Sequence, residues 1–235
     1  MKKLSSVITT AVFILAANVA TAAQVSLTTI SGIWSAGQLT NNQSPTGVGT
    51  SDINWGTSWQ GNPLSGYSFD AALAPSVLVQ DQPFDFGLFT HKNFPILGST
   101  LSWARLDLTF DLMVDGVLRP LSASYLFTHV ETPNVGGGNC CNDRVNFDTL
   151  ASAYDSVNID GLEFTFKLDG FLDELGKPVS FFSTEENKNN TAHLVGRFTT
   201  LNDVPPVSPV PLPASAVLLG AALLGLRAAG LRRKA

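Results

Sequence analysis

Apolar and polar residues alternate with a period of two along several stretches in the middle of the chain. The clearest stretch is 104–114, where Ala, Leu, Leu, Phe, Leu and Val occupy every second position. Because successive side chains of a strand point to opposite faces of a sheet, this pattern predicts a strand with one buried face. Asp115-Gly116 follows as a turn signal and the alternation resumes over 121–127, so we expect the two strands to form a hairpin.

The same alternation predicts further strands throughout residues 23–202. Residues 157–168 repeat it around the turn signal Asp160-Gly161, and no stretch of this region shows a sustained helical period. We therefore expect one all-β domain, an antiparallel β-sandwich with a jelly-roll or Greek-key-like path. The remaining strands are expected at 25–34, 65–72, 76–79, 84–90, 179–184 and 193–201.

Residues 1–22 have the composition of a signal peptide. A basic start is followed by the apolar stretch 7–17 and by Ala20 and Ala22, the small residues that a signal peptidase requires. The apolar stretch is roughly half the length of a membrane-spanning helix. We expect cleavage after Ala22 and export of the remaining chain.

The composition changes again at residue 203. Residues 203–213 contain five prolines, which predicts an extended linker. The segment 214–235 begins with an uncharged apolar run and is expected to form a single transmembrane helix with a basic tail. The positive-inside rule places its basic end in the cytoplasm. That basic cluster consists of Arg232, Arg233 and Lys234.

The expected signal peptide and the C-terminal segment both contribute positive charge to the net charge of −5. Six of the 14 Lys and Arg lie in those ends and all 19 Asp and Glu lie between them, which leaves eight basic against 19 acidic residues, or −11. A strongly anionic surface repels phosphate backbones. Nucleic acid is therefore excluded as a partner.

Cys140 and Cys141 are the only cysteines, and they are adjacent in a loop rich in Gly and Asn. Export would place them in an oxidising compartment. Neighbouring cysteines can close only a strained vicinal disulfide. Two free thiols or intermolecular disulfides are the alternatives, whereas zinc sites usually space their cysteines about two to four residues apart.

Two polar segments of similar sequence follow expected strands: 89–95 (FTHKNFP) and 127–134 (FTHVETPN). In an extended chain His129 and Glu131 lie on one face, within reach of a charge-assisted hydrogen bond or of shared metal ligation. His91 can join them only if the two strands are neighbours. The alternative is that these side chains hydrogen-bond the backbone where the strand pairing stops.

The chain lacks the usual catalytic motifs. It has no nucleophile elbow, no zinc-protease helix motif and no phosphate-binding loop. We therefore expect no catalytic residues, no cofactor and no metal. Calcium would suit acidic turns such as those at Asp169 and Asp173, although no ligand spacing identifies a site. A glycosidase needs two carboxylates across a cleft, and a sugar-binding surface could use Trp55 or Trp59.

The end of the chain resembles a known sorting signal. A Val-Pro-Leu-Pro-Ala motif, an apolar helix rich in Leu, Ala and Gly, and a basic terminus follow one another as in the VPLPA form of the PEP-CTERM domain. The resemblance implies processing by an exosortase, a membrane cysteine protease, and an inner-membrane intermediate before delivery to the cell surface or the extracellular space. Leu212 replaces the Glu of the commoner form, and Arg227 interrupts the apolar run. The motif residues are Val210, Pro211, Leu212, Pro213 and Ala214.

The middle of the chain resembles PEP-CTERM proteins named for a Thr-His-x-Asn motif, which overlap with the choice-of-anchor K domains. This similarity implies a β-rich exported domain on exopolysaccharide-producing Gram-negative bacteria, and it supplies no catalytic residues. We expect a non-enzymatic surface or extracellular-matrix protein that binds polysaccharide or acts structurally. A secreted carbohydrate-active hydrolase and a calcium-dependent adhesin are the alternatives. The segments that carry the resemblance are 53–56 (INWG), 86–96 (FGLFTHKNFPI), 128–134, Cys141 and Asp143 before 145–147, 183–186, and 195–199 (VGRFT).

Overall fold

The structure, a computed structural model, describes residues 24–74, 77–132 and 142–200, with the backbone alone for 148–154. The expected signal peptide (1–22), the linker (203–213) and the C-terminal helix (214–235) lie outside the described residues. Cys140 and Cys141 also lie outside them. Within the described part of the chain there is no helix that is long and apolar enough to cross a membrane.

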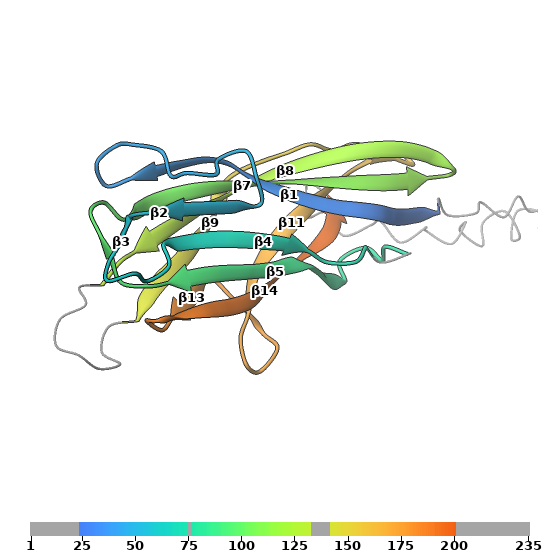
Figure 1. Cartoon of the computed structure of the whole chain (residues 1–235). Coiled ribbons are helices and arrows are strands. Elements are labelled where there is room, and N and C mark those ends of the chain that lie inside the picture. The colour runs from blue at the N-terminus through green and yellow to red at the C-terminus, as the bar shows by residue number, and fades with distance from the viewer. Residues whose placement is uncertain (1–23, 75–76, 133–141, 201–235) are drawn as a thin grey trace, which may run out of the picture.

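Every regular element of the described residues is a strand, and all strand pairings are antiparallel. The all-β prediction is therefore confirmed, as a β-sandwich-like arrangement of two main sheets (Figure 1). The first sheet has the order β1 (Val25–Leu39), β7 (Leu101–Val114), β8 (Val117–Val130), β9 (Asp143–Tyr154), β13 (Phe181–Thr184). The second has the order β10 (Val157–Ile159), β11 (Leu162–Leu172), β14 (Lys188–Thr200), β5 (Pro83–Asn93), β4 (Ser65–Ala71), β2 (Asp52–Trp55), with β12 (Pro178–Val179) beside β11. The short strands β3 (Thr57–Ser58) and β6 (Ile96–Leu97) pair separately.

Both turn signals form tight hairpins, and the first of these was predicted as a hairpin from the sequence. Val114 pairs with Val117 across a turn in which Asp115 has φ 48° and Gly116 has φ 79°. The turn between β10 and β11 is similar, with φ 52° at residue 160 and 86° at residue 161. Two successive positive φ values match the twist of a two-residue hairpin, and Asp-Gly tolerates them.

Other strand predictions were partly wrong. Of the strand expected at 76–79, the described residues 77–79 are not in a strand; Val77 and Val79 are exposed, and Leu78 donates one backbone hydrogen bond to Val25 O (3.3 Å). The strand expected at 179–184 is divided between the two sheets as β12 and β13. β2 and β9 were not predicted, because short or partly polar strands give a weak alternating pattern.

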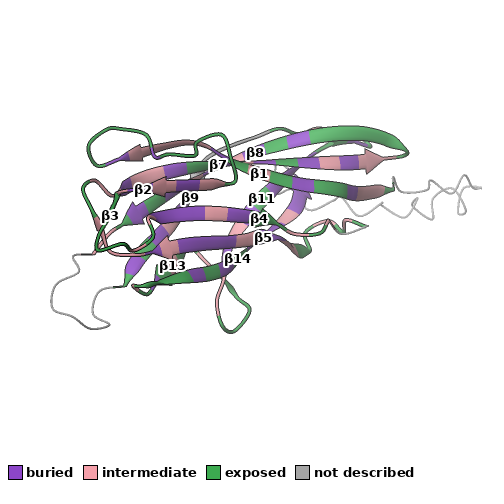
Figure 2. Ribbon diagram, in the orientation of Figure 1, coloured by how far each residue is buried: buried purple, intermediate pink, exposed green. Residues whose placement is uncertain are grey.

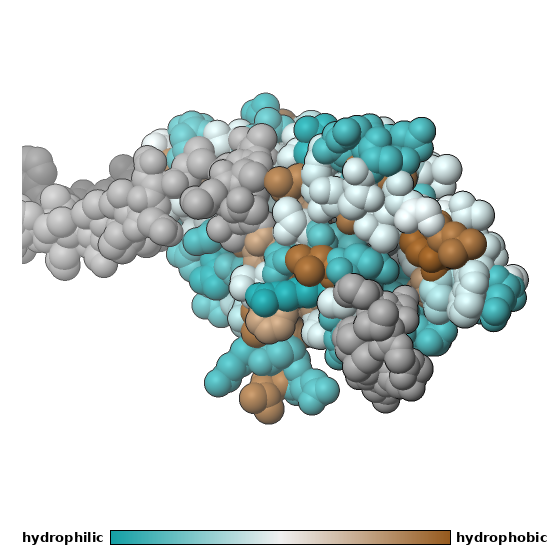
Figure 3. Space-filling model, turned by 90° about the vertical axis from the view of Figure 1, so that its left-hand side faces the viewer, coloured by the Kyte–Doolittle hydropathy of each residue, from teal (hydrophilic) through white to brown (hydrophobic). Residues whose placement is uncertain are grey.

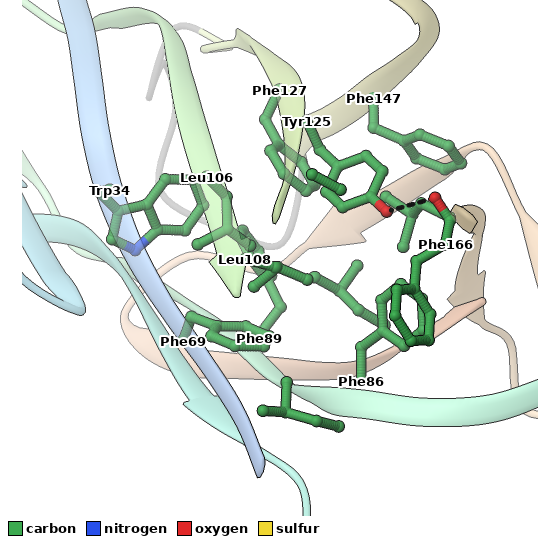
Figure 4. Packing of buried hydrophobic residues seen from close by; sticks show 14 of the residues in the cluster. Trp34, Phe69, Phe86, Phe89, Leu106, Leu108, Tyr125, Phe127, Phe147 and Phe166 are labelled. Atoms are coloured by element: carbon green, nitrogen blue, oxygen red, sulfur yellow. Dashed lines mark hydrogen bonds between the residues drawn. The ribbon is translucent and has the colours of Figure 1, made fainter. Parts of the chain in front are cut away.

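The core lies between the two sheets and is mainly aromatic. The buried positions alternate along the strands (Figure 2). Phe110 of β7 stacks on Phe166 of β11 with ring centroids 3.8 Å apart, and Phe89 of β5 stacks on Phe127 of β8 at 5.7 Å. Figure 4 shows Phe89, Phe127 and Phe166 in this core, together with the hydrogen bond from Tyr125 Oη to the Phe166 carbonyl oxygen (3.3 Å). Each pair joins the two sheets, so burial of these rings holds the sandwich together.

The first and last described strands meet at one end of the sandwich. Val25 and Phe198 line the same apolar cavity of about 390 Å³. β5 runs away from this end, since Pro83 pairs with Arg197 and Asn93 with Lys188. β8 also runs away from it, because its start lies beside Val114, the partner of Val25. The two histidine-containing segments therefore end together at the opposite end of the sandwich.

Candidate functional site

A cluster of polar side chains is buried between the sheets at the end far from Val25 and Thr200. His91 is the next inward-facing residue after Phe89 on β5, and His129 follows Phe127 in the same way on β8. The alternation that fills the core with aromatic rings thus places imidazoles at its end. We call this cluster the polar centre; it consists of Tyr67, His91, His129, Glu131, Thr132, Asp143 and Thr184.

The structure brings together the three residues singled out in the sequence. His129 Nε2 lies 3.0 Å from Glu131 Oε2, the contact expected from their spacing. The rings of His91 and His129 are perpendicular, with centroids 5.0 Å apart. The condition that their strands be neighbours was wrong, because β5 and β8 belong to different sheets and the two rings meet across the core.

The hydrogen bonds of both histidines go to side chains. His129 Nδ1 is 2.6 Å from the Tyr67 hydroxyl, and His91 Nδ1 is 2.8 Å from Thr184 Oγ1. The alternative in which these rings bond the backbone at strand ends is therefore wrong for both histidines.

The sequence pattern did not identify three members of the polar centre, namely Tyr67, Asp143 and Thr184. Tyr67 lies in an alternating stretch of β4 and had the pattern of a core residue. Asp143 starts β9 and Thr184 ends β13, and these two residues are paired across the strands. Only the sheet register brings them beside His91, so no local signal in the sequence could have found them.

Two buried polar atoms of the polar centre have no hydrogen-bond partner among the described residues: His91 Nε2 and Asp143 Oδ2. Thr184 donates its hydroxyl hydrogen to the Asp143 carbonyl oxygen (3.4 Å) and therefore accepts from His91 Nδ1–H, which leaves the lone pair on Nε2. Asp143 Oδ1 accepts hydrogen bonds from Thr132 N (2.8 Å) and Thr132 Oγ1 (3.0 Å). Both His91 and Asp143 are 0% exposed.

Burial shifts the protonation equilibria of this cluster. Desolvation, with a smaller contribution from the charge of His129, holds the pKa of His91 well below its usual value. Desolvation and the neighbouring Glu131 raise the pKa of Asp143, although the Thr132 hydrogen bonds and His129 oppose this. Burial also raises the pKa of Tyr67 well above its usual value, with Asp143 and Glu131 adding to the effect. His91 is therefore a neutral base at neutral pH.

Two overlapping groups of side chains have the geometry of cation ligands. One ligand atom from each of His91, His129 and Asp143 lies within 4.8 Å of the others, and the same holds for Glu131, Asp143 and Glu186. Asp169 and Asp173, which the sequence offered to calcium, form contacts within the described chain. Asp169 forms an ion pair with Arg197 (2.8 Å), and Asp173 Oδ1 accepts hydrogen bonds from the nitrogens of Leu175 and Lys177 (2.9 and 2.8 Å).

The two tryptophans considered for sugar stacking have different environments. Trp55 is 2% exposed and stacks on His91 at 5.9 Å, so it belongs to the wall of the polar centre. Trp59 is 41% exposed. Figure 3 looks onto this end of the molecule, where hydrophilic residues dominate the described surface and hydrophobic ones form separate spots. Of the two, only Trp59 is available to a ligand from solvent.

No protein-family model matches this chain, and no curated protein matches its sequence.

Proposed function

We propose that this chain is an exported, exosortase-sorted bacterial protein of the cell surface or extracellular matrix, with a non-enzymatic, structural role. The observation that carries this proposal is the order of features at the end of the sequence: the motif 210–214, an apolar segment, and the basic cluster 232–234. The N-terminal signal peptide supports export independently.

The arrangement of the described strands supports the same proposal. They begin at Val25 and end at Thr200, and both ends lie beside the same cavity. A chain held by its C-terminal segment would therefore direct the polar centre away from the membrane. The order β1-β7-β8-β9, in which a long connection returns one strand beside a three-stranded meander, supports a Greek-key-like path.

The burial of the polar centre supports a structural role over a hydrolytic one. A glycosidase places two carboxyl groups on either side of the scissile bond, where the substrate reaches both. Asp143 is 0% exposed and the Glu131 side chain is 20% exposed. This geometry suits a cluster that connects the two sheets.

Processing in cells tests the assignment most directly. A full-length chain with a tag between residues 23 and 24 would be followed in cells with and without exosortase. We expect a shortened form at the cell surface in the first case and an unprocessed membrane-bound precursor in the second. Substituting Pro211 and Pro213 by Ala should block processing, whereas substituting Pro205 and Pro206 in the linker should not. An intact precursor in the cytoplasm of both strains would contradict the proposal.

Polysaccharide binding is a second candidate function, and the exposure of Trp59 favours it. An exposed aromatic ring can stack on the apolar face of a sugar. Retention of the full-length chain on the host's own exopolysaccharide should be lost in Trp59→Ala. Equal retention of both proteins would remove this candidate.

A further inference from the structure

The polar centre has the donor atoms and spacings of a transition-metal site. His129 Nε2 lies 3.0 Å from Glu131 Oε2 and 3.9 Å from Asp143 Oδ2. A tetrahedral ion with bonds of about 2.0–2.2 Å holds neighbouring ligand atoms roughly 3.3–3.6 Å apart, which falls between these two distances. His91 contributes another ligand atom within the 4.8 Å limit that also includes His129 and Asp143.

The ligand side chains are already oriented by outer hydrogen bonds. His91 donates from Nδ1 to Thr184, and its Nε2 has no partner. His129 has the Tyr67 hydroxyl at Nδ1, so its Nε2 can also bind a cation. Asp143 uses Oδ1 for Thr132 and keeps Oδ2 unpartnered. Metal-binding histidines and carboxylates in proteins are typically fixed in this way, with the second polar atom held by the protein.

The charges of the cluster favour an occupant that is a cation. Asp143 is fully buried and has Glu131 as a near neighbour, which is an unfavourable pair unless positive charge lies between the two carboxylates. A divalent cation would balance those two negative charges. It would also occupy the lone pair of His91 Nε2, which otherwise stays buried without a donor.

We propose that the polar centre binds one divalent first-row transition-metal ion, with His91 Nε2, His129 Nε2 and Asp143 Oδ2 as its protein ligands and Glu131 as a neighbouring negative charge. Imidazole nitrogens and carboxylate oxygens are ligand types of protein zinc sites, and this set is buried. Two imidazole ligands favour zinc and its neighbours over calcium and magnesium, which prefer oxygen. The ion would join β5 of one sheet to β8 and β9 of the other. This inference does not depend on sorting of the tail.

Zinc binding to the full-length chain tests the proposal. The chain would be purified in detergent with a chelator and dialysed, in a background of Cys140→Ser and Cys141→Ser so that thiols cannot contribute. We expect one bound zinc ion per chain. At a hundredfold excess over Kd, zinc should raise Tm by roughly 5–10 °C for a protein of this size. Calcium at the same concentration should leave Tm unchanged.

Variants of the proposed ligands distinguish zinc binding at the polar centre from zinc binding elsewhere on the protein. His91→Asn keeps an amide donor for Thr184 but lacks Nε2, and Asp143→Asn keeps the acceptor for Thr132 but lacks the charge; both should lose stoichiometric zinc. His193→Asn is the matched control, because His193 is the third histidine, is exposed, and contacts Asp85 instead (2.7 Å). It should bind zinc as the parent does. Zinc retained by both ligand variants, or lost in the control, would overturn the proposal.

The outer hydrogen bond provides a graded test. Thr184→Val should weaken zinc binding roughly 10–100-fold, as removal of outer partners does in known sites. Thr165→Val is the matched control, because Thr165 is a buried threonine whose hydroxyl bonds the Asp155 carbonyl oxygen (2.8 Å) far from the polar centre. Equal zinc affinity in the two variants would show that Thr184 does not position a ligand.

If the ligand variants do not fold, the parent protein still decides the question. Its three histidines give separate ring-nitrogen signals in ¹⁵N–¹H NMR spectra. Zinc should shift Nε2 of His91 and of His129 to the values of metal-bound nitrogen and leave the His193 ring unchanged. Unchanged His91 and His129 rings at saturating zinc would overturn the proposal.

Discussion

Two regions of the sandwich interior are equally buried and differ in the side chains that fill them. In the middle, the rings of Phe110 and Phe166 stack with their centroids 3.8 Å apart. These side chains carry no polar atom that requires a hydrogen-bond partner. At the far end, His91 and Asp143 are as fully buried but keep polar atoms without partners. Burial of apolar surface is favourable by itself, whereas a buried polar group stabilises the fold only when its partners are complete. The aromatic middle should therefore be insensitive to conditions, and the polar centre should depend on ions and pH.

The largest expected effects come from truncating buried aromatic rings, and the aromatic middle provides the first case. Phe110→Ala should lower the free energy of unfolding by about 3–5 kcal/mol, because it removes a fully buried ring from a tight stack between the sheets. Urea denaturation of the full-length chain would measure the loss. Val117→Ala is the control, since Val117 is 49% exposed and its truncation should cost less than about 0.5 kcal/mol. A similar loss in both variants would contradict a core centred on this stack.

Removing the hydroxyl of a buried tyrosine in each region compares the stability contributions of the polar centre and the aromatic middle. Tyr67→Phe should cost about 1–3 kcal/mol, because it leaves His129 Nδ1 buried without the hydroxyl that now lies 2.6 Å away. Tyr125→Phe in the aromatic middle removes a longer bond of 3.3 Å to the Phe166 carbonyl oxygen and should cost only about 0.5–1.5 kcal/mol. Urea denaturation of both variants would rank them. A larger loss of unfolding free energy in Tyr125→Phe than in Tyr67→Phe would contradict the greater dependence of the polar centre on its hydrogen bonds.

The polar centre should also make the metal-free protein sensitive to acid. Because the pKa of His91 is lower in the folded than in the unfolded chain, its contribution to stability is intact above the unfolded value of about 6.5 and is lost as pH falls below it. The limiting slope is about 1.4 kcal/mol per pH unit. The titratable groups that face His91 are Tyr67, His129 and Asp143, and its uncharged neighbours include Trp55 and Thr184.

Comparing the parent protein with His91→Asn isolates the contribution of His91 to the pH dependence of stability. The raised pKa of Asp143 acts in the opposite direction, since its cost is relieved as pH falls, but it is present in both the parent and His91→Asn. With chelator present, unfolding at about pH 7.5 and about pH 5.5 should show a larger loss for the parent than for His91→Asn. Parallel pH profiles would contradict a neutral, buried His91.

The smallest effect is expected at the surface beside the polar centre. Trp59→Ala should change the free energy of unfolding by less than about 0.5 kcal/mol, because Trp59 is 41% exposed. Trp55, only four positions earlier, is 2% exposed, and Trp55→Ala should cost about 3–5 kcal/mol. Thermal unfolding of the pair would show whether only Trp55 belongs to the wall of the polar centre.

The sequence predicted correctly those features that depend on residues close together along the chain. The β7–β8 hairpin follows from alternation and from an Asp-Gly pair that accepts positive φ. The contact between His129 and Glu131 follows from two inward positions on one strand. These features depend on neighbours within a few residues, which the sequence contains directly.

The rest of the site depends on how the sheets stack and pair. His91 meets His129 across the interior, Tyr67 approaches from a third strand, and Thr184 reaches Asp143 only through the β9–β13 register. Alternation predicts which face a residue occupies but not which residue of another sheet lies opposite. Local alternation also predicted a strand at 76–79, but the described residues 77–79 form no strand and bond the edge strand β1 through Leu78 N and Val25 O (3.3 Å).

Crystals of the full-length chain grown with zinc would locate the ion and decide whether the polar centre is a metal site. We expect an anomalous peak within about 2.0–2.2 Å of His91 Nε2, His129 Nε2 and Asp143 Oδ2, between the two sheets. An empty polar centre in zinc-saturated crystals, with zinc bound only at surface groups such as His193, would contradict the proposed metal site.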